Sequence, residues 1–242
     1  MVKYIIFDFD GTLINTRPIW LKGFKEVFSY YGIYHKDSEI IEKCFGVRYG
    51  ALNLGIKQEN IDDFYRKLNK LVKEKLEKAP LFKGVKKVLN ILLSKGFKLC
   101  ICTSSKGALV KEYLSRNNLD KYFNYVVGFE DVKKLKPDPE GIYKIMEFYG
   151  DKDTDKYLMV GNSAKDILAG KNAGVKTALF LPNDHTNNSN KQNLLDLNTN
   201  IVFKSWEDLV NYFGEKYSNW VLYSICRYAQ LAKLIIVKQF ID

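Results

Sequence analysis

The sequence is poor in cysteine and arginine and has no long uncharged apolar run, and each shortage excludes a class of protein. Its 242 residues hold four cysteines, which are too few and too scattered for a disulfide scaffold. No uncharged apolar stretch approaches the roughly 20 residues that a membrane-spanning helix needs. The opening residues MVKYIIFDFDG do not form a secretory signal, because acidic residues follow the short apolar stretch at once. We therefore expect a cytoplasmic protein without a membrane partner.

Only five of the 38 basic residues are arginine, although the formal net charge is +10. The 33 lysines are spread along the whole chain and form no cluster. Because base readout and bidentate phosphate recognition favour arginine, this pattern predicts no nucleic-acid partner. A diffuse positive charge instead favours the approach of small anionic substrates.

Apolar segments with strand-like and helix-like spacing alternate along most of the chain. The strand-like segments are Tyr4–Asp8, Phe97–Thr103, Tyr125–Phe129, Tyr157–Gly161 and Lys176–Leu181. The helix-like segments between them are Val85–Ser94, Lys106–Asn117, Pro139–Tyr149 and Ala164–Ala173. Short apolar strands separated by helices predict an α/β fold, a Rossmann-like parallel sheet with helices on both faces.

The stretch from Arg17 to Ala79 interrupts this alternation, because it contains no convincing strand. Its helix-like segments are Ile19–Tyr31, Glu39–Phe45 and Asn60–Lys78. We therefore predict an α/β core made of residues 1–16 and 80–213, with an all-helical domain, residues 17–79, inserted after the first strand.

Two segments near the C-terminus depart from this pattern. Residues 183–200 hold seven asparagines and neither glycine nor proline, and we expect a surface loop there. Residues 214–242 form a predicted helical extension with apolar residues on most of its faces. Such a helix would pack on the core or on a second copy, so the sequence leaves a monomer and a homodimer both open. A membrane-surface helix is less favoured, because the charges do not gather on one face.

Two aspartates follow the first predicted strand. Asp8 and Asp10, in the run DFDGT, lie at positions i and i+2 and would share one face of a strand. The carboxyl ends of parallel strands border the crevice where α/β proteins bind ligands. Since two close anions repel each other, a bound cation is a natural means of holding both. A turn or helix cap would explain either aspartate alone, but the pair indicates a functional site.

Polar residues follow two further predicted strands, and a lysine lies in a loop before a helix. Thr103 and Ser104 offer hydroxyl and backbone N–H groups near a helix start, which suits an anion. Lys136 places an ammonium group in the loop before another helix. Asn162 follows a strand, and Asp166 comes four residues later. Hydroxyl, ammonium, amide and carboxylate groups are thus expected near the aspartate pair.

In this order the motifs resemble those of the haloacid dehalogenase (HAD) superfamily. The matching runs are DFDGT at Asp8–Thr12, the threonine of ICTSS at Thr103, the lysine of KLKPDP at Lys136, and VGNSAKD at Val160–Asp166. The run DILAGKNAG at Asp166–Gly174 further resembles the phosphoglycolate phosphatase-like branch. The resemblance covers about residues 1–213 and implies that the helical insertion is a cap.

The resemblance implies a Mg²⁺-dependent phosphatase that hydrolyses a small phosphorylated metabolite through an aspartyl-phosphate. Asp8 would be the nucleophile, and Asp10 would be the general acid and then the base that activates water. Thr103 and the Ser104 N–H would hold phosphoryl oxygens, while Lys136 would neutralise charge and hold Asp8.

The implied metal site departs from the family pattern at one position. Mg²⁺ would bridge Asp8, the carbonyl of Asp10 and the fourth motif, where the family usually has an aspartate in place of Asn162. Asn162 offers a carbonyl oxygen without a charge. Either it ligates Mg²⁺ weakly, with Asp166 as a supporting or substitute carboxylate, or the site is impaired.

Other functions remain open from the sequence. A non-catalytic HAD-fold binding protein would keep the pocket after losing a metal ligand at Asn162, although the retained Asp8 and Asp10 favour an enzyme. A sugar-phosphate mutase-like phosphotransferase would use the same residues, with the cap selecting the acceptor. The dehalogenase branch also has asparagine in its fourth motif, but it lacks the carboxylate that Asp10 supplies. In the cap, Arg48 is a candidate for binding a second phosphate or a carboxylate, with a solvated surface arginine as the plainer interpretation.

Overall fold

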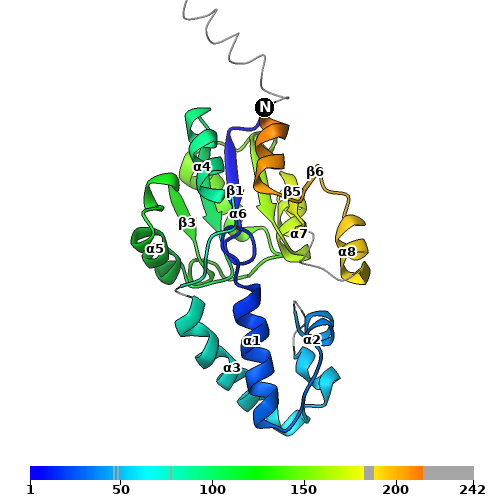
Figure 1. The fold of residues 1–242 in the computed structure, drawn as a ribbon. Coiled ribbons are helices and arrows are strands. Elements are labelled where there is room, and N and C mark those ends of the chain that lie inside the picture. Colours follow the sequence, from blue (N-terminus) through cyan, green and yellow to red (C-terminus); the bar gives the residue numbers. More distant parts are fainter. Residues whose placement is uncertain (46, 48, 77, 183–187, 215–242) are drawn as a thin grey trace, which may run out of the picture.

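The computed structural model, which describes residues 1–45, 47, 49–76, 78–182 and 188–214, is built around a parallel sheet. Its six strands lie in the order β3-β2-β1-β4-β5-β6, and every neighbouring pair is parallel (Figure 1). The strands are β1 (Tyr4–Phe7), β2 (Lys98–Cys102), β3 (Tyr125–Val127), β4 (Tyr157–Gly161), β5 (Lys176–Phe180) and β6 (Ile201–Phe203). The predicted Rossmann-like α/β fold is confirmed.

Helices cover both faces of the sheet, because the strands are apolar on both sides. Along β1, Ile5 and Phe7 belong to one buried cluster, whereas Tyr4 and Ile6 belong to another. The first cluster includes residues of α4 (Val85–Ser94), α5 (Gly107–Arg116) and a helix over residues 206–214. The second includes residues of α6 (Glu140–Tyr149) and α7 (Ala164–Asn172). A strand that is buried on both faces must be apolar throughout. The strand segments therefore do not alternate between apolar and polar residues.

The regular elements in the described part of residues 17–79 are all helices. They are α1 (Arg17–Tyr30), α2 (Asp37–Cys44) and α3 (Ile61–Leu76), with the 3₁₀ helices η1 (Gly50–Leu54) and η2 (Gln58–Asn60) between the last two. These elements pack around their own buried cluster, which includes Phe24, Phe28, Phe64 and Leu68. Figure 1 places them beyond the carboxyl end of β1. The predicted helical content is present, while the division of the chain into a core and a cap domain stays a prediction.

Two chain segments that lie side by side join these helices to the sheet. The backbone N–H of Asn15 donates to the carbonyl oxygen of Pro80 at 2.8 Å. Ile14 and Leu81 form an isolated antiparallel bridge beside that bond. The helical segment therefore leaves and re-enters the sheet at one place, next to the loop that follows β1.

After β5 the chain forms a helix and a strand that were not predicted. Within residues 183–200, expected to be a loop, Asn188–Leu195 form α8, and β6 follows. Leu194 and Leu197 pack against a small buried cluster of Ile167, Leu179 and Leu181. Asparagine is a poor helix former, so the composition favoured a loop, and this packing overrides it. Residues 183–187 of that expected loop and residues 215–242 of the expected helical extension lie outside the described residues.

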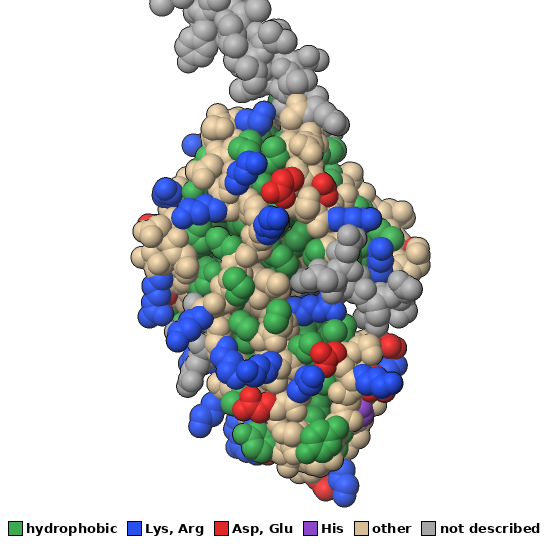
Figure 2. Space-filling view, in the orientation of Figure 1, with side chains coloured by type: hydrophobic (Ala, Val, Ile, Leu, Met, Phe, Trp, Pro, Cys, Tyr) green, Lys and Arg blue, Asp and Glu red, His purple; other side chains and the backbone are tan. Residues whose placement is uncertain are grey.

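Three further 3₁₀ helices lie in the connections: η3 (Asp120–Tyr122), η4 (Phe129–Asp131) and η5 (Thr154–Lys156). On the face shown in Figure 2, lysine and arginine side chains are scattered over both the sheet and the helical segment. Across the described part of the chain, no helix combines the length and apolar character that crossing a membrane requires.

Candidate active site

Three adjacent strands bring the sequence motifs together at one edge of the sheet. β1 lies between β2 and β4, and Asp8, Thr103 and Asn162 each follow the end of one of these strands. The backbone N–H of Asp8 donates to Val160 O at 2.8 Å, and that of Thr103 donates to Val127 O at 3.0 Å. The backbone of Asp8 and of Thr103 is therefore hydrogen-bonded to a neighbouring strand. Both residues lie at the edge of the sheet where α/β proteins bind ligands.

Lys136 connects the first motif to the fourth. Its Nζ donates to Asp8 Oδ1 at 2.7 Å, to Asp166 Oδ1 at 2.6 Å and to the carbonyl oxygen of Cys102 at 2.9 Å. Lys136, Asp8 and Asp166 are all at most 9% exposed. A buried charge is tolerated only when it is paired and hydrogen-bonded, and these contacts use all three N–H donors of the ammonium group.

The site contains more negative than positive charge. Among the described residues, three carboxylates (Asp8, Asp10 and Asp166) lie near the single ammonium group of Lys136. Burial and the neighbouring Asp166 raise the pKa of Asp8 to about 7, against the opposing effect of Lys136. Burial also raises the pKa of Asp10, and a hydrogen bond from Ser105 opposes that shift. Burial alone would lower the pKa of Lys136, but Asp166 and Asp8 hold it well above its usual range. When all three carboxylates are ionised, a divalent cation would balance the charge of the site.

The hydroxyl of Thr12 lies between the side chains of Asp8 and Asn162. The Thr12 hydroxyl lies 2.9 Å from Asp8 Oδ2 and 3.2 Å from Asn162 Oδ1, and both oxygens are acceptors for it. Gly11 has φ +81°, and a Cβ on it would come within 2.6 Å of Asn162 Nδ2. Glycine at this position therefore permits both the left-handed turn and the close approach of the amide.

Asp166 has donors on both of its carboxylate oxygens. Oδ1 accepts from Lys136, and Oδ2 accepts from the backbone N–H of Ser163 at 3.0 Å and from its hydroxyl at 2.6 Å. These contacts suit Asp166 to hold Lys136 and the start of α7 in place. Direct coordination of a metal by Asp166 stays a prediction.

The remaining oxygen donors fit a Mg²⁺ ion. Within the described ranges, no group of three or more His, Cys, Asp or Glu side chains forms a metal-binding cluster. The Asp8 carboxylate and the Asn162 amide oxygen nevertheless flank one hydroxyl, in a site with excess negative charge. Mg²⁺ prefers oxygen ligands, keeps several waters and is often bound by only one or two carboxylates. Asp8, Asn162 and the backbone carbonyl of Asp10 are the groups that would hold it.

The first backbone N–H groups of α5 are occupied by a side chain of the protein. Glu130 accepts from Gly107 N at 2.9 Å and from Ala108 N at 3.3 Å, and these bonds hold the pKa of Glu130 below its usual range. An anion would therefore bind in the loop before the helix. There, Thr103 Oγ1 accepts from Ser105 N at 3.0 Å, and no acceptor for the Thr103 hydroxyl hydrogen occurs among the described residues.

Ser105 and Ser163 also enter the site, although the sequence named Ser105 only as one hydroxyl of an anion site with Thr103 and Ser104 and gave Ser163 no role. Ser105 Oγ donates to Asp10 Oδ2 at 2.5 Å, a contact between residues 95 positions apart. Ser163 and Asp166 have the spacing of a helix capping box, which was a usable local signal. No local signal could have indicated the contact between Ser105 and Asp10. The predicted substrate-binding residue Arg48 lies outside the described residues.

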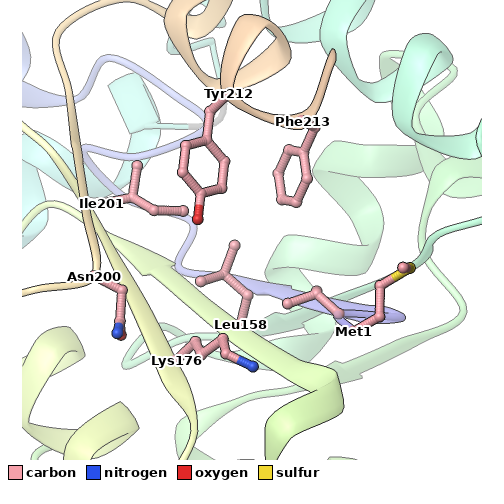
Figure 3. A pocket seen from close by; sticks show the side chains of 8 residues that line it. Met1, Leu158, Lys176, Asn200, Ile201, Tyr212 and Phe213 are labelled. Atoms are coloured by element: carbon pink, nitrogen blue, oxygen red, sulfur yellow. The ribbon is translucent and has the colours of Figure 1, made fainter. Parts of the chain in front are cut away.

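A pocket of about 300 Å³ lies away from these residues (Figure 3). Its lining includes Met1, which precedes β1, together with Lys176 and Ile201, which begin β5 and β6. The pocket is therefore at the amino-terminal edge of the sheet, whereas Asp8 follows the carboxyl end of β1. It takes no part in the site described above.

Comparison with known proteins assigns the chain to a family. The model for haloacid dehalogenase-like hydrolases matches residues 5–180. Pyrophosphatase PpaX of Halalkalibacterium halodurans is 34% identical over 183 residues, which cover 74% of this chain and 83% of that protein. Pyrophosphatase PpaX of Anoxybacillus flavithermus is 34% identical over 180 residues, covering 73% and 82% of the two chains.

Solved structures share the fold. A haloacid dehalogenase-like hydrolase of Streptococcus pneumoniae matches with a TM-score of 0.73 at 17% identity, covering 88% of this chain and 98% of that one. The motif order, the meeting of the motifs at one edge of the sheet and the family match all agree. The chain belongs to the haloacid dehalogenase-like hydrolase family and, within it, to the phosphatase branch.

Proposed function

We propose that this chain is a Mg²⁺-dependent phosphatase that hydrolyses a small phosphorylated metabolite through an aspartyl-phosphate on Asp8. The observation that carries the proposal is the Asp8 carboxylate held by Lys136 at 2.7 Å, with Asp10 two residues further along the same loop. A buried structural aspartate would also need a charge partner, but a second carboxylate nearby adds repulsion that a structural role does not require. We place the protein in the cytoplasm, where the free thiols of Cys44, Cys100 and Cys102 would stay reduced.

In the first half of the reaction, Asp8 attacks the phosphorus atom of the substrate. A bond forms between a carboxylate oxygen of Asp8 and phosphorus while the bond from phosphorus to the leaving oxygen breaks. Asp10 gives its proton to that leaving oxygen. The Thr103 hydroxyl would donate to a phosphoryl oxygen, and Lys136 would hold Asp8 against the charge of the incoming phosphate.

In the second half, water hydrolyses the aspartyl-phosphate. Asp10, now a carboxylate, takes a proton from the water as its oxygen bonds to phosphorus. The bond between phosphorus and Asp8 breaks, inorganic phosphate leaves, and Asp8 returns as a carboxylate. Asp10 is again protonated, so the next cycle begins with the same charges.

Mg²⁺ would be held by Asp8, Asn162 and the Asp10 carbonyl, and when bound it neutralises the negative charge of the phosphoryl group and of Asp8. The balance of three carboxylates against one ammonium group supports this part of the proposal. The helices of residues 17–79 would act as a cap whose closure excludes water and selects the substrate. Their position beyond the carboxyl end of β1 in Figure 1 supports that role.

Replacing the nucleophile tests the proposal. Asp8→Asn should lower turnover of p-nitrophenyl phosphate with Mg²⁺ at least about 10³-fold, because an amide cannot form the aspartyl-phosphate. Asp62→Asn, at an exposed position on α3, is the matched control and should keep wild-type turnover. Beryllofluoride, which mimics a phosphoryl group on a carboxylate, should inhibit the wild type. Substantial turnover by Asp8→Asn would show that Asp8 is not the nucleophile.

The same assays separate the other functions. A panel of phosphorylated metabolites should include inorganic pyrophosphate, since the relatives compared here are named pyrophosphatases. An impaired binding protein would leave every phosphate ester intact while Asn162→Asp gained activity. A mutase-like phosphotransferase would pass the phosphoryl group to a sugar phosphate faster than to water.

A further inference from the structure

The hydroxyl of Ser105 is bound to the side chain of Asp10. Ser105 Oγ donates to Asp10 Oδ2 at 2.5 Å, and the other carboxylate oxygen, Oδ1, has no partner within the described part of the chain. A hydrogen bond from a neutral hydroxyl to a carboxylate is shorter and stronger than one between neutral groups. The two oxygens of Asp10 are therefore distinguished from each other before any substrate arrives.

Ser105 is itself held in place through its backbone. Its N–H donates to Thr103 Oγ1 at 3.0 Å, and its carbonyl oxygen accepts from Phe129 N at 3.1 Å. Two residues later α5 begins, with its first N–H groups bound to Glu130. A hydroxyl on a segment fixed on both sides can hold a second side chain in one orientation.

We propose that Ser105 is the positioning residue for Asp10 and that, by holding Oδ2, it makes Oδ1 the oxygen that gives and takes the proton. This inference rests on the proposed roles of Asp10 as acid and base. In the acid form, Oδ1 carries the proton while Oδ2 still accepts the hydrogen bond from Ser105. In the base form, Oδ2 keeps that bond and Oδ1 faces the proton of the attacking water. One orientation of Asp10 serves both halves of the reaction.

The neighbouring hydroxyls divide the work between them. Ser105 gives its single hydroxyl hydrogen to Asp10, so it has none left for a phosphoryl oxygen. Thr103 shows the complementary pattern, because its oxygen accepts from Ser105 and its hydrogen has no acceptor among the described residues. Phosphate binding is thus assigned to Thr103 and proton positioning to Ser105.

The dependence of the rate on the leaving group distinguishes a residue that positions Asp10 from one that binds phosphate. A misplaced general acid slows the departure of phenolate, a poor leaving group, far more than that of p-nitrophenolate, which leaves without protonation. The measurement is kcat/KM, which reports only the steps up to formation of the aspartyl-phosphate. Ser105→Ala should lower kcat/KM for phenyl phosphate at least about tenfold and that for p-nitrophenyl phosphate less than about twofold. Ser105→Thr, which keeps a hydroxyl, should retain the wild-type ratio, as should Ser115→Ala at an exposed position on α5.

A double-mutant cycle completes the test. Asp10→Asn should show the same selective loss, and Ser105→Ala should add little to it, because both changes remove one function. Equal losses on both substrates would make Ser105 a phosphate-binding residue and overturn the inference, as would losses that add in the double variant. If Ser105→Ala fails to fold, Ser105→Gly removes the same hydroxyl and carries the comparison. The proposed function fails separately, if the wild type hydrolyses neither substrate.

Discussion

In the proposed metal site, Asn162 and Asp8 would determine how strongly a divalent cation is held. Asn162 contributes an oxygen without a charge, and Asp8 shares its carboxylate with Lys136 and Thr12. Asp166 accepts hydrogen bonds from Lys136 and Ser163, and its direct coordination of the metal stays a prediction. In this proposal Asp8 would supply most of the attraction for the cation, and substitutions at Asn162 and at Asp8 test the two residues separately.

Asn162→Asp should tighten Mg²⁺ binding, because it adds a negative charge beside Asp8 without changing the size of the side chain. We expect the Mg²⁺ concentration at half-maximal rate to fall about tenfold or more, since hard cations respond strongly to ligand charge. Asn69→Asp, at an exposed position on α3, adds the same charge far from the site and should leave the Mg²⁺ titration unchanged. An unaltered titration for Asn162→Asp would remove Asn162 from the metal site.

Mg²⁺ binding should also weaken as the pH falls through 7. Burial and Asp166 raise the pKa of Asp8 to about 7, so a proton competes with the cation below that pH. The apparent dissociation constant should rise between pH 8 and pH 6, approaching about tenfold per pH unit at the acid end. Calorimetric titration at pH 8, 7 and 6 measures it, with Asp8→Asn as the variant that should lose the dependence. A constant affinity over this range would mean that Asp8 titrates near the ordinary value for aspartate.

At the scale of the elements, the helix over residues 206–214 completes one face of the sheet. Trp206, Leu209 and Phe213 are at most 1% exposed and belong to the same buried cluster as β1 and α4. The aromatic ring of Trp206 lies 5.7 Å from that of Phe7, centroid to centroid, on the strand that carries Asp8. The helix thus packs against β1, the strand that precedes Asp8, although it contributes no residue to the candidate site.

Leu209→Ala should therefore destabilise the whole fold. Removing a fully buried leucine side chain costs about 2–5 kcal/mol in the free energy of unfolding, through lost apolar burial and the cavity left behind. Asn211→Ala, at an exposed position on the same helix, should change it by less than about 0.5 kcal/mol. Urea unfolding of the three proteins gives the comparison, and equal stabilities for Leu209→Ala and the wild type would contradict the packing described here.

At the scale of the whole molecule, a net charge of +10 surrounds a site that is itself negative. The positive side chains are scattered over the face in Figure 2, so on that face the positive field is broad. Such a field attracts small anions to the protein as a whole. In the proposed mechanism, a bound cation would offset the local excess of carboxylates as a phosphate approaches Asp8.

The rate of substrate capture should consequently fall with ionic strength. Between about 0.02 and 0.3 M KCl the Debye length shrinks severalfold, so kcat/KM for a phosphorylated substrate should drop several-fold. The kcat value should change little, because the charges that act at Asp8 are buried and poorly screened. Steady-state kinetics at saturating Mg²⁺ measure both quantities. A kcat/KM that does not depend on salt would assign the lysines to solubility alone.

Much of the fold was predictable because, in the core strands and helices, the local spacing of apolar residues agrees with the structure that forms. β4 begins and ends where its apolar segment does, and so does α4. Residues 17–79 contain helices and no described strand, as their spacing indicated. α8 was missed because its support comes from Leu194 packing on a distant cluster, which asparagine-rich composition conceals. β6 has only three residues, too few to show a strand pattern in the sequence. Its formation depends on pairing with β5.

Residue types and their order along the chain by themselves determined the chemistry of this protein: carboxylates after β1, a hydroxyl after β2, a lysine before α6 and an amide after β4. Each is a short-range feature that lies next to a predicted strand or helix. The hydrogen bonds between these groups depend on the tertiary structure. Lys136 bonds to Asp8 and Asp166, Glu130 closes the start of α5, and Ser105 holds Asp10. Those contacts join residues between 22 and 128 positions apart, and parallel strand pairing, which local sequence does not encode, brings them within hydrogen-bond distance.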